Sequence, residues 1–268
     1  MRLPKILASI FLILSINFQS CSTVPVTGRS QLNVIPSSEL MSMSFQQYDQ
    51  FLKENKLSTD QQQSEMIKRV GSKISKAVEE YFAQKNMSSE LSGYQWEFNL
   101  VENEQVNAWA MPGGKVVFYT GILPITQTEA GVAVVMGHEV AHAVAEHGGE
   151  RMSHQVLQQF GGMALSKVLE KESDALQGIL LTAYGVGSQV GVMLPFSRLH
   201  ESEADHLGLI FMAMAGYNPN EAVSFWQRMA DAKGGQAPPE WLSTHPSDQT
   251  RIEDLKKALP EALKYYKK

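Results

Sequence analysis

Residues 137–142 read GHEVAH, with two histidines four positions apart and a glutamate directly after the first. On an α-helix, residues four apart share a face, so His138 and His142 can present two imidazole nitrogens to one ion. Glu139 lies about 100° further round, beside the ion but outside its ligand set. This pattern is typical of a zinc site whose adjacent carboxylate takes a proton from water. The alternative is a chance match on a helix surface, so a third ligand must be found.

A third ligand has to come from another segment. The H-E-x-x-H-x-x-G-x-x-H arrangement is excluded because the chain has Ala145 and Gly148 at the positions that it requires. The later segment 198–208, RLHESEADHLG, carries Glu201 and Asp205 four apart on one helical face. Glu201 can reach the metal while Asp205 accepts the free N–H of a ligand histidine. By itself this segment would be a solvated acidic surface, but the upstream motif favours the ligand interpretation.

Four neighbouring polar residues receive no ligand role. Glu146 and His147 follow the motif closely, and we expect them to stabilise or cap its helix. His200 and Glu203 point to other faces of their own predicted helix.

The first twenty residues, MRLPKILASIFLILSINFQS, have the basic start, apolar run and small or polar end of an export signal. Cys21 is the only cysteine, so no intramolecular disulfide can form. The stretch FQSC resembles a lipobox, although Phe18 stands where an aliphatic residue is usual. We expect lipidation of Cys21, with Ser22 favouring an outer-membrane address in the periplasm. The alternative is an ordinary signal peptide cut near Ser20 or Ser22.

The composition fits a globular domain and excludes some partners. The chain has 268 residues, 43% hydrophobic and 19% charged, with a formal charge of −5. No basic surface follows from these numbers, so nucleic acid is not an expected partner. The oligomeric state is not predicted.

Periodicity predicts an α+β domain that is mostly helical. Residues 38–57 and 60–84 have helical spacing, whereas 94–102 alternates like a strand. The run NAWAM, a Pro-Gly-Gly turn and KVVFYTG predict that a small antiparallel sheet precedes the motif. Thr126 and Glu129 have the spacing of a capping box for the motif helix. We divide the chain into a signal peptide (1–20), an extended tether (21–37) and one domain (38–268).

The apolar stretch 175–196, ALQGILLTAYGVGSQVGVMLPF, has two interpretations. Its glycines and glutamines weaken it as a membrane span. We expect a buried helix over the active site.

HEVAH, then ESEAD, then LSTHPSDQTRI resembles the membrane-associated gluzincin peptidases: the CAAX prenyl proteases, the HtpX-type heat-shock proteases and the mitochondrial Oma-type proteases. The segments CSTVPVTGRSQLNVI and NAWAMPGGKVVFYTGIL match a soluble, periplasmic lipoprotein branch. The resemblance covers essentially the whole mature chain. It implies a zincin fold and one Zn²⁺ per chain on His138, His142 and Glu201, with Glu139 as catalytic base and Asp205 behind a ligand histidine.

The resemblance also implies a substrate strand and two C-terminal site residues. We expect residues 107–110 to form an edge strand whose backbone can pair with an extended substrate, and the resemblance places that strand along the cleft; its members are Asn107, Ala108, Trp109 and Ala110. Trp109 stands where relatives more often have Phe. His245 and Arg251 are similar to the family's C-terminal His and Arg, and Arg251 is a candidate substrate-binding residue. Either could stabilise the oxyanion or hold Glu201, and His245 could instead fill the open position of the zinc at rest. The alternative is a helix start at Pro246 with Arg251 in an ordinary ion pair.

The leading hypothesis is a zinc endopeptidase that cleaves misfolded or misassembled envelope proteins. The competing hypothesis is a chaperone-like or assembly-factor lipoprotein whose metal site is closed or vestigial. A structural zinc domain is disfavoured because such sites usually have four protein ligands and no use for an adjacent glutamate.

Overall fold

The computed structural model describes residues 21–24, 26–170, 172–189, 193–232, 245 and 249–267. The signal peptide predicted for residues 1–20 lies outside this range. The strands are β1 (Cys21–Thr23), β2 (Ser30–Leu32), β3 (Glu97–Val101), β4 (Ala108–Met111) and β5 (Lys115–Tyr119). The helices are α2 (Ser37–Glu54), α3 (Gln61–Gln84), α4 (Leu123–Thr126), α5 (Glu129–Val144), α6 (His147–Val168), α7 (Asp174–Ser188), α8 (Leu194–Met214), α9 (Glu221–Asp231) and α11 (Gln249–Ala262), with short 3₁₀ turns at Ser88–Leu91 and Thr120–Ile122. The predicted α+β, mostly helical class is confirmed.

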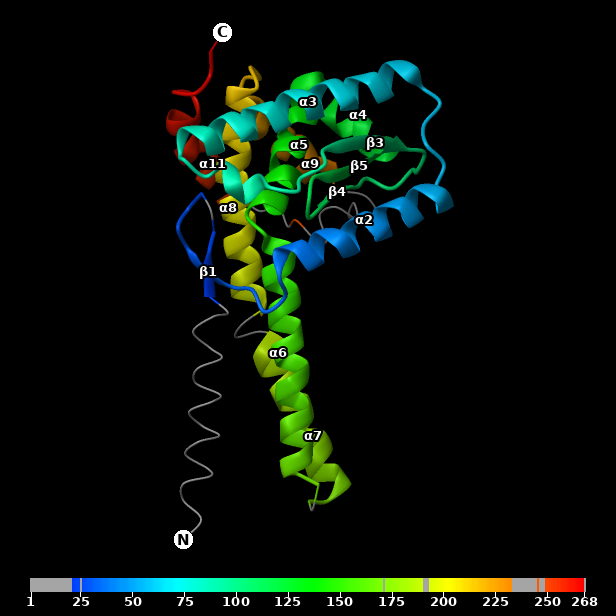
Figure 1. The fold of residues 1–268 in the computed structure, drawn as a ribbon, viewed down its shortest axis with the longest axis vertical. Coiled ribbons are helices and arrows are strands. Elements are labelled where there is room, and N and C mark those ends of the chain that lie inside the picture. Colours follow the sequence, from blue (N-terminus) through cyan, green and yellow to red (C-terminus); the bar gives the residue numbers. More distant parts are fainter. Residues whose placement is uncertain are drawn as a thin grey trace.

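A three-stranded sheet lies between α3 and α2 (Figure 1). The predicted antiparallel hairpin is confirmed: β4 pairs with β5, and Gly113 and Gly114 adopt positive φ in the turn between them. β3, however, pairs in parallel with β5, so this sheet is mixed. The strand order is β3-β5-β4. β3 and β5 both run in the direction opposite to β4, and because β3 lies next to β5, these two strands are parallel.

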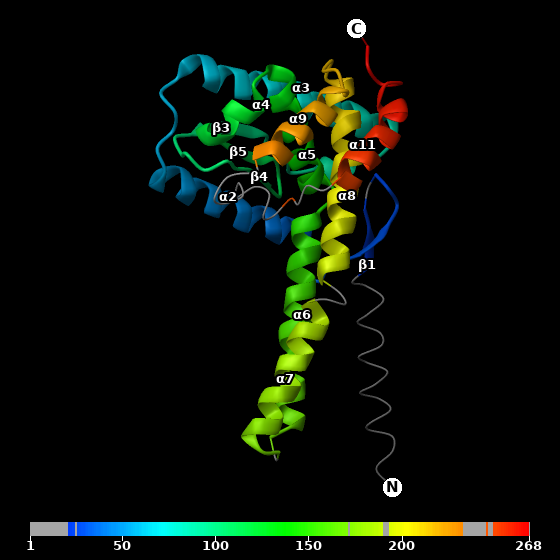
Figure 2. The same cartoon turned by 180° about the vertical axis from the view of Figure 1, so that it is seen from behind.

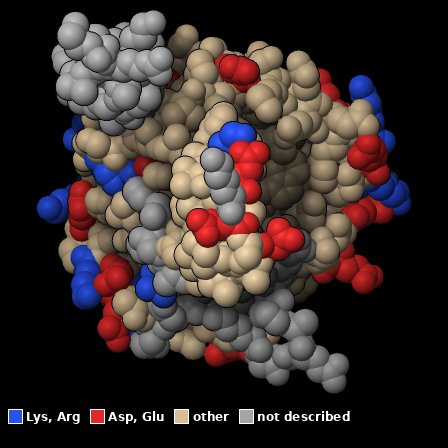
Figure 3. Space-filling model, turned by 90° about the horizontal axis from the view of Figure 1, so that it is seen from below, with Lys and Arg blue, Asp and Glu red and all other residues tan. Residues whose placement is uncertain are grey.

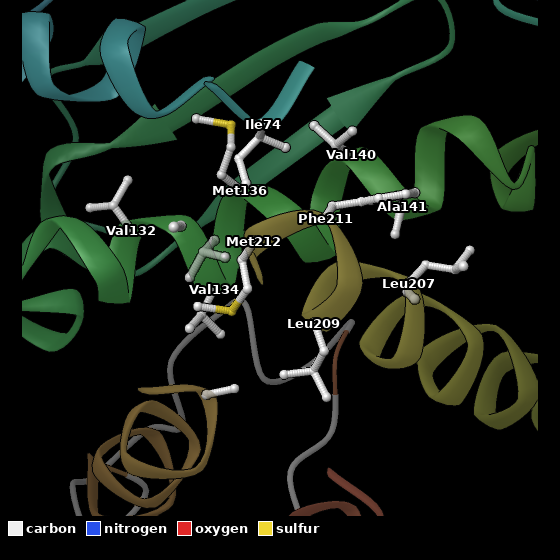
Figure 4. Packing of buried hydrophobic residues seen from close by; sticks show 14 of the residues in the cluster. Ile74, Val132, Val134, Met136, Val140, Ala141, Leu207, Leu209, Phe211 and Met212 are labelled. Carbon is white, nitrogen blue, oxygen red and sulfur yellow. The ribbon is translucent and has the colours of Figure 1, made fainter. Parts of the chain in front are cut away.

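The two faces of the sheet have different coverings. Tyr48 and Phe51 of α2 pack against Val117 and Trp109 on one face. The other face meets α3 and α5 in the main core. Figure 4 shows Ile74 of α3, Met136 of α5 and Phe211 of α8 meeting in that core. Each such buried side chain contributes roughly 1.5–3 kcal/mol to folding by leaving water.

The N-cap of the motif helix α5 lies two residues after the predicted one. Thr128 is the N-cap, and its side chain accepts a hydrogen bond from the Gly131 N–H. Thr126 ends α4, and Gln127 at φ 60° separates the two helices. The capping box predicted for Thr126 and Glu129 is therefore wrong. Glu129 instead pairs with Arg69 of α3 at 2.8 Å.

Helices α6 and α7 form a hairpin that projects away from the body (Figures 1 and 2). No side chain of α7 is buried, so the buried helix predicted over the active site is wrong. Figure 3 looks at the end of this projection, where red and blue side chains stand on a largely tan surface. Within the part of the chain that is described, no helix has both the length and the apolar content to cross a membrane.

The segment predicted as an extended tether contains folded structure. β1 and β2 pair antiparallel, with Cys21 opposite Leu32. In both ribbon views this small hairpin lies beside α8 (Figures 1 and 2). Val24 in its connecting loop is fully buried and belongs to the main core. The composition of the segment is turn-rich, but Val24 anchors it to the domain.

Candidate metal centre and active site

The two histidines of the motif converge as the helical spacing predicts. α5 is buried along nearly its whole length, and His138 and His142 are 2% and 9% exposed. Their Nε2 atoms lie 3.0 Å apart. α8 packs lengthwise against α5 and brings Glu201 to them. The Glu201 carboxylate oxygens lie 3.3 Å from each Nε2 atom.

A fourth side chain meets this group from the C-terminal part of the chain. His245 Nδ1 lies 3.0 Å from His138 Nε2 and 2.9 Å from Glu201 Oε2. Among the described residues, one ligand atom from each of these four side chains lies within 4.8 Å of the others. From the sequence, His245 could stabilise an oxyanion, hold Glu201 or fill the open zinc position. Its Nδ1 position favours the last two.

Asp205 lies one turn after Glu201 on α8 and contacts the far side of His138. Its Oδ1 is 2.9 Å from His138 Nδ1, so the imidazole N–H points at the carboxylate and Nε2 is left for the ion. This is the contact that the sequence analysis expects of Asp205.

Arg251 holds the two acids of α8. Its guanidinium donates to both Asp205 oxygens at 2.7 Å and to Glu201 at 3.1 Å, and it stacks on the Trp226 ring at 3.5 Å. It is 8% exposed. These contacts favour the role of holding Glu201 over that of binding substrate. Because a guanidinium matches a carboxylate in two places at once, it fixes the orientation of Asp205.

His142 is oriented through a second imidazole, which the sequence analysis missed. His142 Nδ1 lies 2.8 Å from His147 Nδ1, and His147 Nε2 lies 2.9 Å from Glu203 Oε2. The sequence predicts that His147 stabilises or caps the motif helix, and it gives Glu203 no ligand role. In a continuous helix, position 147 would point about 140° away from 142. Glu146 adopts a left-handed conformation at φ 57°, which ends α5 and turns His147 back.

Burial and hydrogen bonding shift the pKa values in opposite directions. Burial lowers the pKa of His138, but its bonds with Asp205 and Glu201 raise it to about 9. Burial lowers the pKa of His142 well below its ordinary value. Burial raises the pKa of Glu201, yet its hydrogen bonds with His138 and His142 outweigh this and hold it far below the usual range. Glu201 therefore stays an anionic ligand.

Glu139 lines a small cavity of about 170 Å³ together with His142, His245 and Ala110. Its Oε1 lies 3.4 Å from His245 Nε2. The glutamate is 3% exposed, so its carboxylate is almost entirely shielded from bulk solvent.

The predicted substrate strand lies at the edge of the sheet, as expected. β4 has one strand neighbour, β5, among the described residues, and Asn107 directly precedes it. Ala110 lines the cavity. Trp109 points to the other face of the sheet, where its ring meets Phe51 with centroids 4.9 Å apart. Trp109 therefore packs against α2 and does not shape the cavity lining.

The donor set fits a zinc ion. Two imidazole nitrogens and one carboxylate are the protein ligands typical of catalytic zinc sites. The Nδ1 atoms of His138 and His142 are held by Asp205 and His147. Their Nε2 atoms therefore point toward the Glu201 carboxylate, and the three groups enclose one possible ion position. His138, His142 and Glu201 are therefore the residues that would hold the metal.

Comparison with known proteins agrees with this geometry. The family model described as "Peptidase family M48" matches residues 69–259. The mitochondrial metalloendopeptidase OMA1 of Saccharomyces cerevisiae is 37% identical over 186 residues, covering 67% of this chain and 51% of that protein. The human metalloendopeptidase OMA1, mitochondrial, is 29% identical over 92% of this chain and 47% of its own length. The β-barrel assembly-enhancing protease of Escherichia coli (strain K12) is 30% identical over 60% of this chain and 34% of its own length.

This chain spans about half the length of the OMA1 relatives and about a third of the bacterial one. The family match, however, includes both helices that supply the metal ligands, α5 and α8. The chain belongs to peptidase family M48.

Proposed function

We propose that this chain is a zinc-dependent endopeptidase of the bacterial cell envelope that hydrolyses misfolded or misassembled envelope proteins. The observation that carries the proposal is the placement of Glu139, which faces the same cavity as His142 while the ligand atoms converge beside it. A structural metal site would have no use for that carboxylate.

The chain's own residues divide the chemistry. A zinc ion, when bound, supplies Lewis-acid polarisation of the scissile carbonyl and lowers the pKa of water to roughly 7. Glu139 accepts the proton of the attacking water and then delivers a proton to the departing amide nitrogen. The β4 edge offers backbone N–H and C=O groups that can pair with an extended substrate, next to the cavity that Ala110 lines.

The envelope location is part of the proposal and rests on the N-terminal sequence. The export signal, the lipobox-like FQSC and Ser22 support a lipid anchor on Cys21 that faces the periplasm from the outer membrane. The name of the Escherichia coli relative, a protease that enhances β-barrel assembly, supports substrates among envelope proteins.

One observation favours the alternative function, a chaperone-like or assembly-factor lipoprotein. His245 belongs to the same group of potential ligands as His138, His142 and Glu201, and four protein ligands are typical of a closed site. In a peptidase, His245 must leave this position beside the other ligands before substrate enters. In a chaperone-like protein with a closed metal site, His245 stays there.

The substitution Glu139→Gln separates the two functions. The amide keeps the shape of the side chain but cannot take a proton, so we expect unchanged zinc content and a loss of casein or envelope-protein cleavage of about 10²–10⁴-fold. Glu170→Gln, at the exposed end of the α6–α7 hairpin, is the matched control and should cleave like the parent. Undiminished proteolysis by Glu139→Gln would exclude it as the base. Full rescue of a deletion phenotype by the same variant would favour the alternative.

A further inference from the structure

Two features of the molecule are not explained by peptide hydrolysis. The loop between β1 and β2 packs against the catalytic body, although its sequence reads as a tether. The fully buried His147 touches a metal ligand without itself lying in the ligand cluster.

A continuous chain of hydrogen bonds connects these features. His147 Nε2 donates to Glu203 Oε2 at 2.9 Å, which leaves its Nδ1 to accept the N–H of His142. Thr27 Oγ1 donates to the other oxygen of Glu203, and Arg29 Nε donates to Oε2 at 3.1 Å. With these assignments, every donor in the chain of hydrogen bonds has an acceptor. His142 is thereby left with its Nε2 lone pair toward the ligand cluster.

Arg29 also connects Glu203 to a second buried carboxylate. Its two terminal nitrogens donate to Glu150 at 3.0 and 2.8 Å, and His200 contacts Glu150 at 2.8 Å. The His200 ring stacks on the His147 ring with centroids 4.2 Å apart. The imidazole that supports His142 therefore has a fixed plane as well as fixed hydrogen bonds.

The Glu203 carboxylate is the common acceptor of this group. His147 Nε2, Thr27 Oγ1 and Arg29 Nε all point at its two oxygens, and a carboxylate in such a position accepts from each of them. A neutral imidazole that donates at Nε2 accepts at Nδ1, so this arrangement fixes which His147 nitrogen faces His142.

The backbone that turns His147 toward His142 is also held by the N-terminal segment. The Glu146 carboxylate accepts hydrogen bonds from Asn33 Nδ2 and Ser37 Oγ, both at 2.6 Å. Non-glycine residues rarely adopt a left-handed conformation without such support. Both routes thus run from the segment that ends at Ser37, the first residue of α2, to the C-terminal end of α5.

We propose that Thr27 and Arg29, acting through Glu203 and His147, are positioning residues that orient the metal ligand His142. The loop between β1 and β2 is then a built part of the metal site, six to eight residues after the predicted lipidation site, Cys21. The contacts of this loop with Glu203 raise the affinity of the site for its ion. Loss of these contacts weakens ion binding, while the other ligands stay in place.

Partners of this kind, which hold ligand histidines from behind, typically change metal affinity 10- to 100-fold when removed. Glu203→Gln keeps the size of the side chain but removes the charge that His147 faces. We expect that variant to bind Zn²⁺ about 10- to 100-fold more weakly in competition with a chromophoric chelator. Thr27→Val removes one hydroxyl at an exposed position and should cause a smaller loss, whereas Thr27→Ser should restore parental affinity.

The control is Glu261→Gln, which removes the carboxylate that His206 of α8 contacts at 2.9 Å. It should leave Zn²⁺ affinity unchanged. The visible absorption spectrum of the Co²⁺-substituted full mature chain gives a second readout, and it should shift in Glu203→Gln and Thr27→Val but not in Thr27→Ser or Glu261→Gln. A purely structural role would not separate the two Thr27 variants.

Parental affinity and spectrum in both Glu203→Gln and Thr27→Val would overturn the proposal. So would equal losses in Glu261→Gln, since these would report general destabilisation. If Glu203→Gln fails to fold, the Thr27 pair decides alone. The inference rests on the metal site of the proposed peptidase but not on catalysis: a parent chain that binds Zn²⁺ without cleaving protein would contradict the proposed function and leave this measurement intact.

Discussion

Glu150 is a carboxylate at 1% exposure, held between Arg29 and His200. Burial raises its pKa, but the bonds from His200 and Arg29 outweigh burial and lower the pKa to about 2. A lowered folded-state pKa gives stability that is present above the ordinary value of 4.5 and lost as pH falls toward 2. Glu150 should therefore contribute to acid unfolding.

We expect Glu150→Gln to flatten the dependence of Tm on pH between about 5 and 2.5, because the amide has no proton to gain there. Thermal unfolding should be followed in the presence of a chelator, so that metal loss in acid does not enter. Some slope should remain because Glu203 also has a lowered pKa. Glu253→Gln, exposed on α11, is the control. A variant whose slope equals that of the parent would show that Glu150 does not take part.

At the same scale, the sequence predicts some site residues and not others for a physical reason. The positions of His138 and His142 follow from one helical period, and Glu201 and Asp205 repeat that period on α8. His147 does not follow from it, because the left-handed Glu146 depends on hydrogen bonds from Asn33 and Ser37, more than a hundred positions away. Local spacing carries no signal for such a turn.

Among the elements, α5 and α8 must approach each other closely for His138 to meet Glu201. Gly137 and Gly208 make this approach possible, since a Cβ on Gly208 would lie 2.9 Å from the His138 backbone nitrogen. A Cβ on Gly137 would lie 2.8 Å from the Gly208 carbonyl oxygen. At both glycines, the atoms that an added Cβ would meet belong to the backbone of the facing helix. Backbone atoms cannot move away by a rotamer change, as side-chain atoms can.

Gly208→Ala should therefore destabilise the protein and weaken Zn²⁺ binding. Alanine favours a helix over glycine by up to about 1 kcal/mol. Overpacking costs about 1–3 kcal/mol, so a net loss is expected. The matched control is Gly178→Ala on α7, where an added Cβ meets nothing within 4 Å and the helix preference alone should act. Equal Tm changes of the same sign in both variants would contradict close packing as the reason for glycine at 208.

The sheet shows the same division between local and distant information. The turn glycines and alternating residues predict β4 and β5 and their antiparallel pairing. β3 could pair with either edge of the β4–β5 hairpin, and it pairs with β5. Alternation within Glu97–Val101 predicts a strand but cannot show which edge that strand joins. Similarly, Thr126 and Thr128 both fit a helix start, and Gln127 at φ 60° decides for Thr128.

In the whole molecule, apolar composition does not determine burial. The stretch 175–196, most of which forms α7, is rich in leucine, isoleucine and glycine, and this composition favours a buried helix over the active site. Instead Ile179 and Phe160, on α7 and α6, are 66% and 61% exposed, and α7 packs mainly on α6. What sets their position is the length of α6, which carries the chain away from the body before it returns (Figure 1).

This arrangement predicts unequal local stability. Helices α5 and α8 share buried faces with each other and the core, so their amides should exchange hydrogen only through global or near-global opening. α7 has no buried side chain, and among the described elements α6 is its one extensive neighbour, so α7 can open without disturbing the core. Hydrogen exchange followed by mass spectrometry should show α7 peptides exchanging at least about tenfold faster than α5 peptides, which corresponds to about 1.4 kcal/mol less opening free energy.

Chelation of Zn²⁺ should speed exchange in α5 and α8, where the ligands lie, and leave α7 unchanged. Protection of α7 equal to that of α5 in the isolated monomer would contradict a projecting hairpin, because burial against the body is the only source of such protection within one chain.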